Sequence, residues 1–137
     1  MASIQRAHIV MAVKDLRVSQ RWYEKVLDCT ADEVDPGNWV FMHRDTTVFM
    51  LGCCPDETPA WDIANHQYIA YLVVDDVDTF HTRAERAIGE AGGAILKPPR
   101  DEPWGMREMA IQTVDGHRMM IATNIGTPSP AWPGPNQ

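Results

Sequence analysis

Two segments of the chain carry side chains capable of acid–base chemistry at matching places. His8 opens the segment 8–15, and Tyr68 opens the similar segment 68–75. An imidazole titrates close to neutral pH and can act as a general base, and a phenol can donate a proton. We therefore interpret His8 and Tyr68 as candidate catalytic residues that form a polar pair in a pocket. The alternative for His8 is a strand histidine that is simply hydrogen-bonded inside a cavity.

The three cysteines offer less chemistry. Cys29, Cys53 and Cys54 are odd in number and fit neither a disulfide framework nor a zinc motif. No neighbouring base would lower the pKa of Cys53 or Cys54, so a nucleophilic role is not favoured. Reduced thiols, the lack of a signal-peptide stretch and the lack of a membrane-span length of apolar residues predict a cytoplasmic protein without a membrane partner.

The composition of the chain limits the classes of partner that it can bind. The chain has 137 residues, enough for one domain with a real core, and a net charge of −7 with a pI near 5.0. Because phosphate binding requires basic surfaces, this charge argues against a nucleic-acid partner. It is compatible with a neutral or cationic small ligand, although many proteins are acidic for solubility alone.

The two similar segments each predict a strand that runs into a helix start. Such an internal repeat indicates two copies of a strand–helix–strands module. In the first copy, Asp15 is the expected N-cap of a helix over 17–28. The apolar stripe of this helix comprises Val18, Trp22 and Val26, with Tyr23 and Leu27 beside it. Its strands are expected at 4–13, 30–35, 38–44 and 46–52, with a turn at 35–38.

The second copy opens at about residue 66 and follows the same order. Asp75 and Asp76 cap a helix over 77–91, which Gly92 and Gly93 end. Strands are expected at 94–98, 106–113 and 117–123, with a hairpin turn at Asp115-Gly116. We therefore divide the chain into module one (1–52), a linker (53–65), module two (66–123) and a Pro-rich tail (124–137) that forms an extended strap or a mobile end.

This pattern resembles the vicinal oxygen chelate superfamily, which includes glyoxalase I, the extradiol dioxygenases and the fosfomycin- and bleomycin-resistance proteins. The resemblance covers about residues 5–123. The segment from Pro103 to Glu108, followed by the hairpin Asp115-Gly116-His117, is particularly similar to the bleomycin-resistance branch. The other residues that carry the resemblance are 8–16, 22–23, 26–28 and 73–78. It implies an α+β fold of two paired βαβββ modules, with curled mixed sheets around a cavity, and a homodimer.

The resemblance also implies where a metal would bind. In metal-dependent members the first and last strands of each module supply ligands, here His8, Phe49 or its neighbour Met50, Tyr68 and Met120. A divalent metal requires three or four His, Glu, Asp or Cys donors at one point. His8 is the good donor in this set, so we predict no metal and no other cofactor.

Aromatic and methionine side chains point to binding instead, because rings stack on planar ligands and Met adapts to irregular shapes. Strand alternation places Val40 and Met42 on one face and Trp39, Phe41 and His43 on the other. The alternative is that these side chains belong to the core. The predicted ligand-binding residues are Trp39, Phe49, Tyr68, Trp104, Arg107 and Met120.

Arg107 and Glu108 are neighbours on one expected strand, so they point to opposite faces. Arg107 either holds a carboxylate or phosphate of a ligand or forms a structural ion pair with Asp101 or Glu102.

The function that we predict is metal-independent binding of an aromatic or otherwise planar small molecule, as in resistance by sequestration. The alternative is a lyase, isomerase or dioxygenase of the same superfamily that uses His8 as a base or as a metal ligand. A third possibility is a module whose pocket is filled by its own Met and Phe side chains. The sequence leaves open whether the protein is an enzyme.

Overall fold

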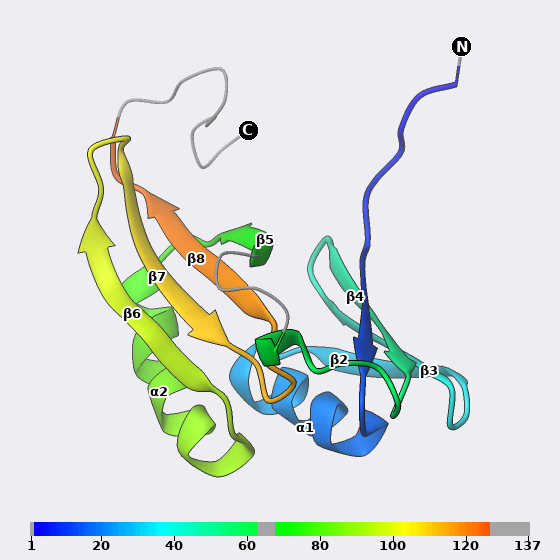
Figure 1. Cartoon of the computed structure of the whole chain (residues 1–137). Helices are drawn as coiled ribbons and strands as arrows, with labels where there is room; N and C mark the ends of the chain where they lie inside the picture. The colour runs from blue at the N-terminus through cyan, green and yellow to red at the C-terminus, as the bar shows by residue number, and fades with distance from the viewer. Residues whose placement is uncertain (1, 63–67, 127–137) are drawn as a thin grey trace.

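The chain folds into two βαβββ modules in series, and the computed structural model describes residues 2–62 and 68–126 of it (Figure 1). The first module comprises β1 (Ile9–Val13), α1 (Leu16–Val26), β2 (Thr30–Asp35), β3 (Trp39–Arg44) and β4 (Thr47–Cys53). The second comprises β5 (Tyr68–Val73), α2 (Val77–Ala91), β6 (Ala94–Asp101), β7 (Met106–Gln112) and β8 (Arg118–Asn124). The predicted α+β class and the repeated element order are confirmed.

Each module builds its own four-stranded mixed sheet. The strand orders are β1-β4-β3-β2 and β5-β8-β7-β6, and the first strand of each module runs parallel to the last. The remaining pairs are antiparallel. The two sheets stay separate and open, so within the described residues β1 and β5 each have one unpaired edge.

The predicted helix starts are confirmed, and one position of the predicted stripe is wrong. Asp15 caps α1 through the amides of Arg17 and Val18, and Asp76 caps α2 in the same way. Val18 is 46% exposed, whereas Ser19 is fully buried. The buried residues of α1 are Ser19, Trp22, Tyr23 and Val26, which follow the i, i+3, i+4, i+7 spacing of one helix face.

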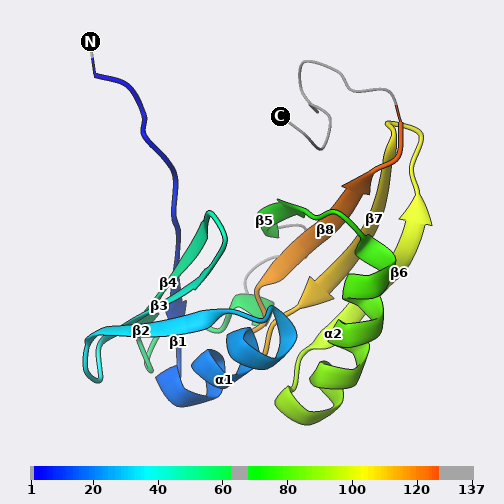
Figure 2. The same cartoon turned by 180° about the vertical axis from the view of Figure 1, so that it is seen from behind.

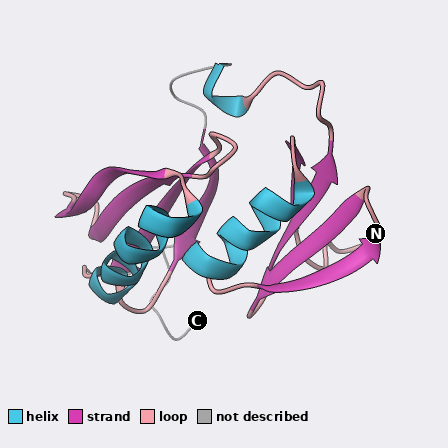
Figure 3. Cartoon of the chain, turned by 90° about the horizontal axis from the view of Figure 1, so that it is seen from below, coloured by secondary structure: helices cyan, strands magenta, loops and turns pink. Residues whose placement is uncertain are grey.

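The core lies between each helix and one face of its sheet. Figures 2 and 3 show α1 and α2 side by side at the junction of the modules, with the sheets to either side. The Trp22 indole of α1 donates a 2.8 Å hydrogen bond to the carbonyl of Gly92, at the end of α2. Gly93 follows with φ of +86°, and a Cβ there would lie 2.4 Å from the Gln112 carbonyl oxygen and 2.7 Å from Trp22 Nε1. Only glycine permits this close approach of the two modules.

The first strand is shorter than predicted, and β6 (Ala94–Asp101) is longer than the predicted 94–98. The first strand covers 9–13 rather than 4–13, because β4 begins at Thr47 and leaves residues 4–6 without a strand to pair with. The linker contains a short 3-10 helix, Ala60–Asp62. The linker residues 63–67 and the tail residues 127–137 lie outside the described part of the chain. No helix within that part is long and apolar enough to cross a membrane.

Candidate functional site

The first sheet presents an aromatic face on the side away from α1. Val40 and Met42 of β3 are buried at 3% and 0% exposure, so the alternate residues Trp39 and Phe41 point the other way and are half-buried. Phe41 pairs with Met50 of β4, which extends this face. The six-membered part of the Trp39 indole lies against Gly52, where a Cβ would come within 2.8 Å of the ring. The predicted alternation along this strand is confirmed.

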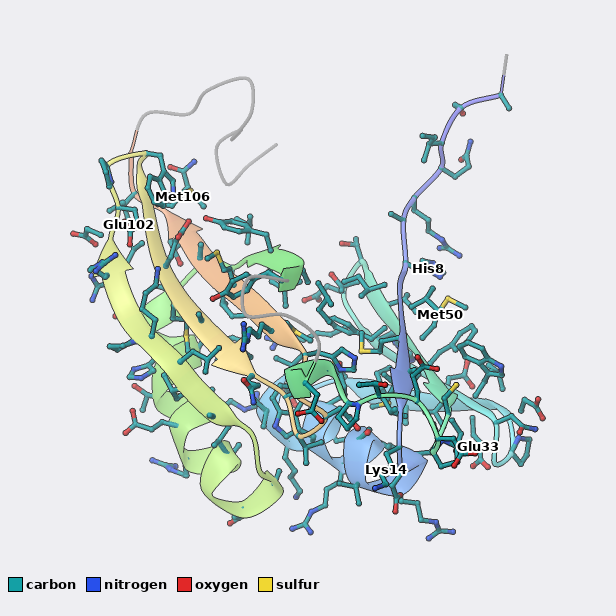
Figure 4. The ribbon with its side chains drawn as sticks, in the orientation of Figure 1. His8, Lys14, Glu33, Met50, Glu102 and Met106 are labelled. Carbon is teal, nitrogen blue, oxygen red and sulfur yellow. The ribbon has the colours of Figure 1, made fainter. Side chains whose placement is uncertain are left out.

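His8 stands at the open end of this helix-free face. Met11 and Val13 of β1 are buried toward α1, so alternation places His8, Val10 and Ala12 on the opposite face. His8 Nε2 is buried and has no hydrogen-bond partner. Figure 4 shows His8 and Met50 on the first module, well apart from Glu102 and Met106 on the second.

Phe49 lies on the helix side of the same sheet. It is 2% exposed and packs against Tyr23, with ring centroids 5.0 Å apart. The neighbouring Met50 therefore lies on the helix-free face. Of the two residues that the sequence offered for the implied metal position, Phe49 and Met50, it is the one on the same face as His8. A shift of one residue along a strand exchanges the two faces of a sheet, and this shift separates Phe49 from His8.

The second sheet carries a buried carboxylate on its helix-free face. Glu108 of β7 is 1% exposed, and its Oε2 accepts hydrogen bonds from the Tyr71 hydroxyl and, at 2.8 Å, from Trp104 Nε1. Lys97 Nζ lies 3.8 Å from the other oxygen, Oε1. Burial and the adjacent Glu108 raise the pKa of Tyr71 well above its usual value, so this phenol keeps its proton and remains a donor at neutral pH.

Tyr68 and Met120 lie close to this cluster without joining it. Tyr68 is 40% exposed at the start of β5 and pairs with Arg118. A register shift between Tyr68 and Ala70 then places Tyr71, rather than Ala70, opposite Met120, while Tyr68 lies two strand positions earlier. His8 immediately precedes β1 of the first sheet, whereas Tyr68 begins β5 of the second. His8 Nε2 has no hydrogen-bond partner, so this nitrogen does not form the predicted polar pair with Tyr68.

Arg107 points to the helix side, opposite Glu108, as alternation predicted. Its guanidinium donates to Asp78 of α2 at 3.1 Å and to Asp101 of β6 at 2.9 Å. The structural ion pair with Asp101, one of the two alternatives from the sequence, is therefore present. These two carboxylates bind all three guanidinium nitrogens, which leaves fewer N–H donors for a ligand.

Two clefts lie between the modules, in equivalent places. A cavity of about 290 Å³ follows the free edge of β1 to the β7–β8 turn, and one of about 760 Å³ follows β5 to the β3–β4 turn. The second is lined by Phe49, Tyr71 and Phe80, together with Arg44, Arg83 and Cys29. Burial raises the pKa of Cys29 to about 12, so this thiol is not a nucleophile at neutral pH.

The smaller cleft contains a histidine that the sequence did not single out. His117 lines it, and its Nδ1 is buried without a hydrogen-bond partner. Burial lowers the pKa of this imidazole, and the nearby Asp115 opposes the shift.

The residues at the implied metal positions do not fit a divalent metal. They supply one imidazole from His8, one phenol from Tyr68, and thioethers from Met50 and Met120. Zinc, iron and manganese sites use several imidazole, carboxylate or thiolate donors. Within residues 2–62 and 68–126, no group of three or more His, Cys, Asp or Glu side chains could hold a metal ion.

Sequence reasoning did not identify the roles of Glu108 and Tyr71. It placed Glu108 and Arg107 on opposite faces without deciding which was buried. The available signal was the spacing of Trp104 and Glu108 around a tight turn, because an indole N–H that packs against protein needs an acceptor.

Comparison with known proteins adds family-level information. Residues 5–121 match the sequence model of the Glyoxalase/Bleomycin resistance protein/Dioxygenase superfamily. Comparison with curated proteins gives no match.

Several solved structures share the fold at low sequence identity. Hypothetical protein SA1046 from S. aureus is 19% identical with a TM-score of 0.70, over 89% of this chain and 95% of that one. The fosfomycin resistance protein FosX from Mesorhizobium loti is 22% identical with a TM-score of 0.65, over 91% and 95%. TioX from Micromonospora sp. ML1 is 18% identical with a TM-score of 0.65, over 91% and 100%. At these identities the likeness shows the fold alone.

Proposed function

The chain belongs to the Glyoxalase/Bleomycin resistance protein/Dioxygenase superfamily, and we propose that within it the protein binds and sequesters a small molecule without a metal. The ligand is aromatic or otherwise planar. The superfamily description, which includes bleomycin resistance proteins, supports a resistance role.

The observation that carries this proposal is the set of side chains on the two helix-free faces. Aromatic rings and thioethers there are only partly covered, although each sheet has a complete apolar core on its other face. Trp104 is 53% exposed and Tyr68 is 40% exposed. Large apolar side chains that gather outside the core are typical of a ligand-binding surface. The set comprises Trp39, Phe41, Met50, Tyr68, Tyr71, Trp104 and Met120.

The donor set at the implied metal positions supports metal independence. Elemental analysis by mass spectrometry tests it, on protein purified without added metal or chelator and again after addition of Fe²⁺, Mn²⁺, Ni²⁺ and Zn²⁺. We expect substoichiometric metal throughout. Stoichiometric metal in any sample would contradict the proposal and would make His8 the first ligand to examine by His8→Ala.

Ligand binding is tested by calorimetry with bleomycin and with a panel of planar aromatic compounds. We expect Trp104→Ala and Tyr68→Ala each to weaken binding at least tenfold. Glu33→Gln, which changes an exposed carboxylate on β2, the edge strand of the first sheet, should leave it unchanged (Figure 4). If both variants keep the wild-type affinity for every compound that binds, the proposed surface is wrong.

We extend the proposal to a homodimer and a cytoplasmic location. A second copy is the natural partner for the unpaired edges of β1 and β5, and the three cysteines are free thiols. Light scattering coupled to gel filtration measures the assembly. A monomer at micromolar concentration would contradict the dimer and leave ligand binding to be judged separately.

The second candidate function is an enzyme, a lyase, isomerase or dioxygenase of the superfamily. The buried and unpartnered Nε2 of His8 favours it, because such a nitrogen is available to take a proton or to bind a metal. Turnover of a bound ligand that is lost in His8→Gln, while binding is retained, would favour this function over sequestration.

A further inference from the structure

Trp104 combines high exposure with a fixed orientation. More than half of the residue is exposed, yet its indole N–H donates to the buried Glu108 carboxylate at 2.8 Å. An exposed side chain ordinarily samples several rotamers. Here the hydrogen bond selects one of them, so one face of the indole is held toward solvent.

The backbone that carries Trp104 is also held in place. The Gly105 carbonyl accepts hydrogen bonds from the amides of Ile125 and Gly126, at 2.9 and 3.0 Å. Gly105 has a φ of +84°, and a Cβ on Gly126 would lie 2.8 Å from Gly105 Cα. The turn before β7 is therefore pressed against the end of β8, and Trp104 is presented from a rigid base.

Stability alone does not account for a carboxylate at position 108. Met106 and Ala110, on the same face of β7, are apolar and buried at 1% and 2% exposure. Burying a carboxylate costs free energy that its hydrogen bonds and a nearby cation only offset, and an apolar residue of similar size often serves a fold equally well. What Glu108 adds is the orientation of two aromatic side chains, Trp104 and Tyr71.

We propose that Glu108 is a positioning residue, which holds the Trp104 and Tyr71 rings ready to receive an uncharged planar aromatic ligand. The inference rests on the proposed function and specifies its ligand class. Because the Trp104 N–H is already engaged, the indole recognises the ligand through its ring face and not through a hydrogen bond.

The charges around the cluster support an uncharged ligand. Glu102 accepts from Arg100 Nη2 at 2.9 Å and lies 3.4 Å from Lys97 Nζ, which in turn faces Glu108. The two cations and the two carboxylates compensate one another, so this surface provides no net charge to attract an ion.

Fluorine NMR of 5-fluorotryptophan-labelled protein tests the inference. The chain has five tryptophans, and the Trp104→Phe and Trp39→Phe variants assign the two signals of interest. The probes are 1-naphthol and coumarin, with decahydro-1-naphthol as the saturated control. We expect the planar probes to shift the Trp104 signal in a saturable way, and the saturated control to leave it in place.

The positioning role is separated from a structural one by three variants. Glu108→Gln, which keeps the side-chain volume, should weaken probe binding at Trp104 at least fivefold and speed up exchange of the indole proton. Trp104→Phe, which keeps a ring without the N–H, should weaken binding by a similar factor, measured by calorimetry because this variant lacks the Trp104 signal. Combining it with Glu108→Gln should add little, because both changes remove one interaction. Glu33→Gln makes the same chemical change at an exposed position on β2, and it should alter the response of neither the Trp104 nor the Trp39 signal to the probes.

The outcomes distinguish this inference from the proposed function. Unchanged probe affinity in Glu108→Gln, or additive losses in the double variant, would overturn the positioning role. A Trp39 signal that responds to planar probes while Trp104 does not would overturn it too, and would leave ligand binding on the first sheet intact. If neither tryptophan responds to either planar probe, both proposals fail.

Discussion

Ser19 of α1 donates a 2.5 Å hydrogen bond to Asp115 of the β7–β8 turn, and this bond ties a helix of the first module to a hairpin of the second. Ser19 is fully buried, and the second oxygen of Asp115 accepts from the Lys14 amide at 3.4 Å. The contact joins residues 96 positions apart in the chain. It therefore contributes to how the two modules are held together.

We predict that Asp115→Asn destabilises the protein by about 1–3 kcal/mol, because a charged acceptor of a buried hydroxyl is lost. Ser19→Ala should destabilise the protein less than Asp115→Asn, because it removes the hydroxyl donor together with the free-energy cost of burying that hydroxyl. Urea denaturation measures both, with the exposed Asp32→Asn as the control. Equal stability of Asp115→Asn and the wild type would show that this bond does not secure the module junction.

Tyr71→Phe should lower the free energy of unfolding by about 1–2 kcal/mol, because the buried Glu108 loses one of its two donors on Oε2. Tyr68→Phe is the matched control on the same strand, since Tyr68 is 40% exposed, and it should change stability by less than about 0.5 kcal/mol. Thermal and urea unfolding of the two variants compare them directly. A loss of unfolding free energy in Tyr71→Phe no larger than that in Tyr68→Phe would mean that the buried carboxylate does not depend on Tyr71.

Gly93→Ala should be among the most damaging small substitutions, at about 3 kcal/mol or more. A positive φ opposes the added methyl group, as do Cβ contacts of 2.4 Å with the Gln112 carbonyl oxygen and 2.7 Å with Trp22 Nε1 of the first module. Gly37→Ala has a similar φ of +81° and open space around it, so it should show the backbone cost alone, about 1 kcal/mol. Similar melting temperatures for the two variants would contradict the tight approach of the modules at Gly93.

Stability should fall as the pH drops below about 6.5, partly through His117. Its pKa in the folded protein lies below the ordinary value of 6.5, chiefly because of burial, so the unfolded chain binds the proton more readily. The stabilisation is complete above 6.5 and is lost as the pH falls toward the folded-state pKa.

The difference between wild type and His117→Gln isolates this contribution from that of the carboxylates. We expect the difference in melting temperature to shrink between pH 7.5 and pH 5. A difference that stays constant over this range would show that His117 titrates equally in the folded and unfolded states.

Local chemistry explains which parts of the fold the sequence predicts. The caps Asp15 and Asp76 and the positive-φ Gly37 act on their immediate neighbours, and all three are found where the pattern placed them. The predicted stripe of α1 contains the apolar Val18 and omits the polar Ser19. Ser19 is buried instead because its partner, Asp115, comes from the other module.

The candidate site was harder to predict, because the position of each of its residues depends on a contact distant in sequence. One residue of register exchanges Phe49 for Met50, and the register shift after Tyr68 brings Tyr71 to Met120. One donor to the buried Glu108 is Tyr71, which lies 37 positions earlier in the chain, so this part of the cluster depends on the pairing of β5 with β8 and of β8 with β7.

The unpaired edge of β1 also affects how the purified chain behaves. Its sequence, IVMAV, contains no charge and no proline, and Val10 is 60% exposed. Free edges of this composition add strands from other molecules and promote aggregation unless something covers them. We therefore expect the solubility of this protein to depend on which partner covers the edge of β1. If that partner is a second copy, dilution below the dimer dissociation constant would expose the edge.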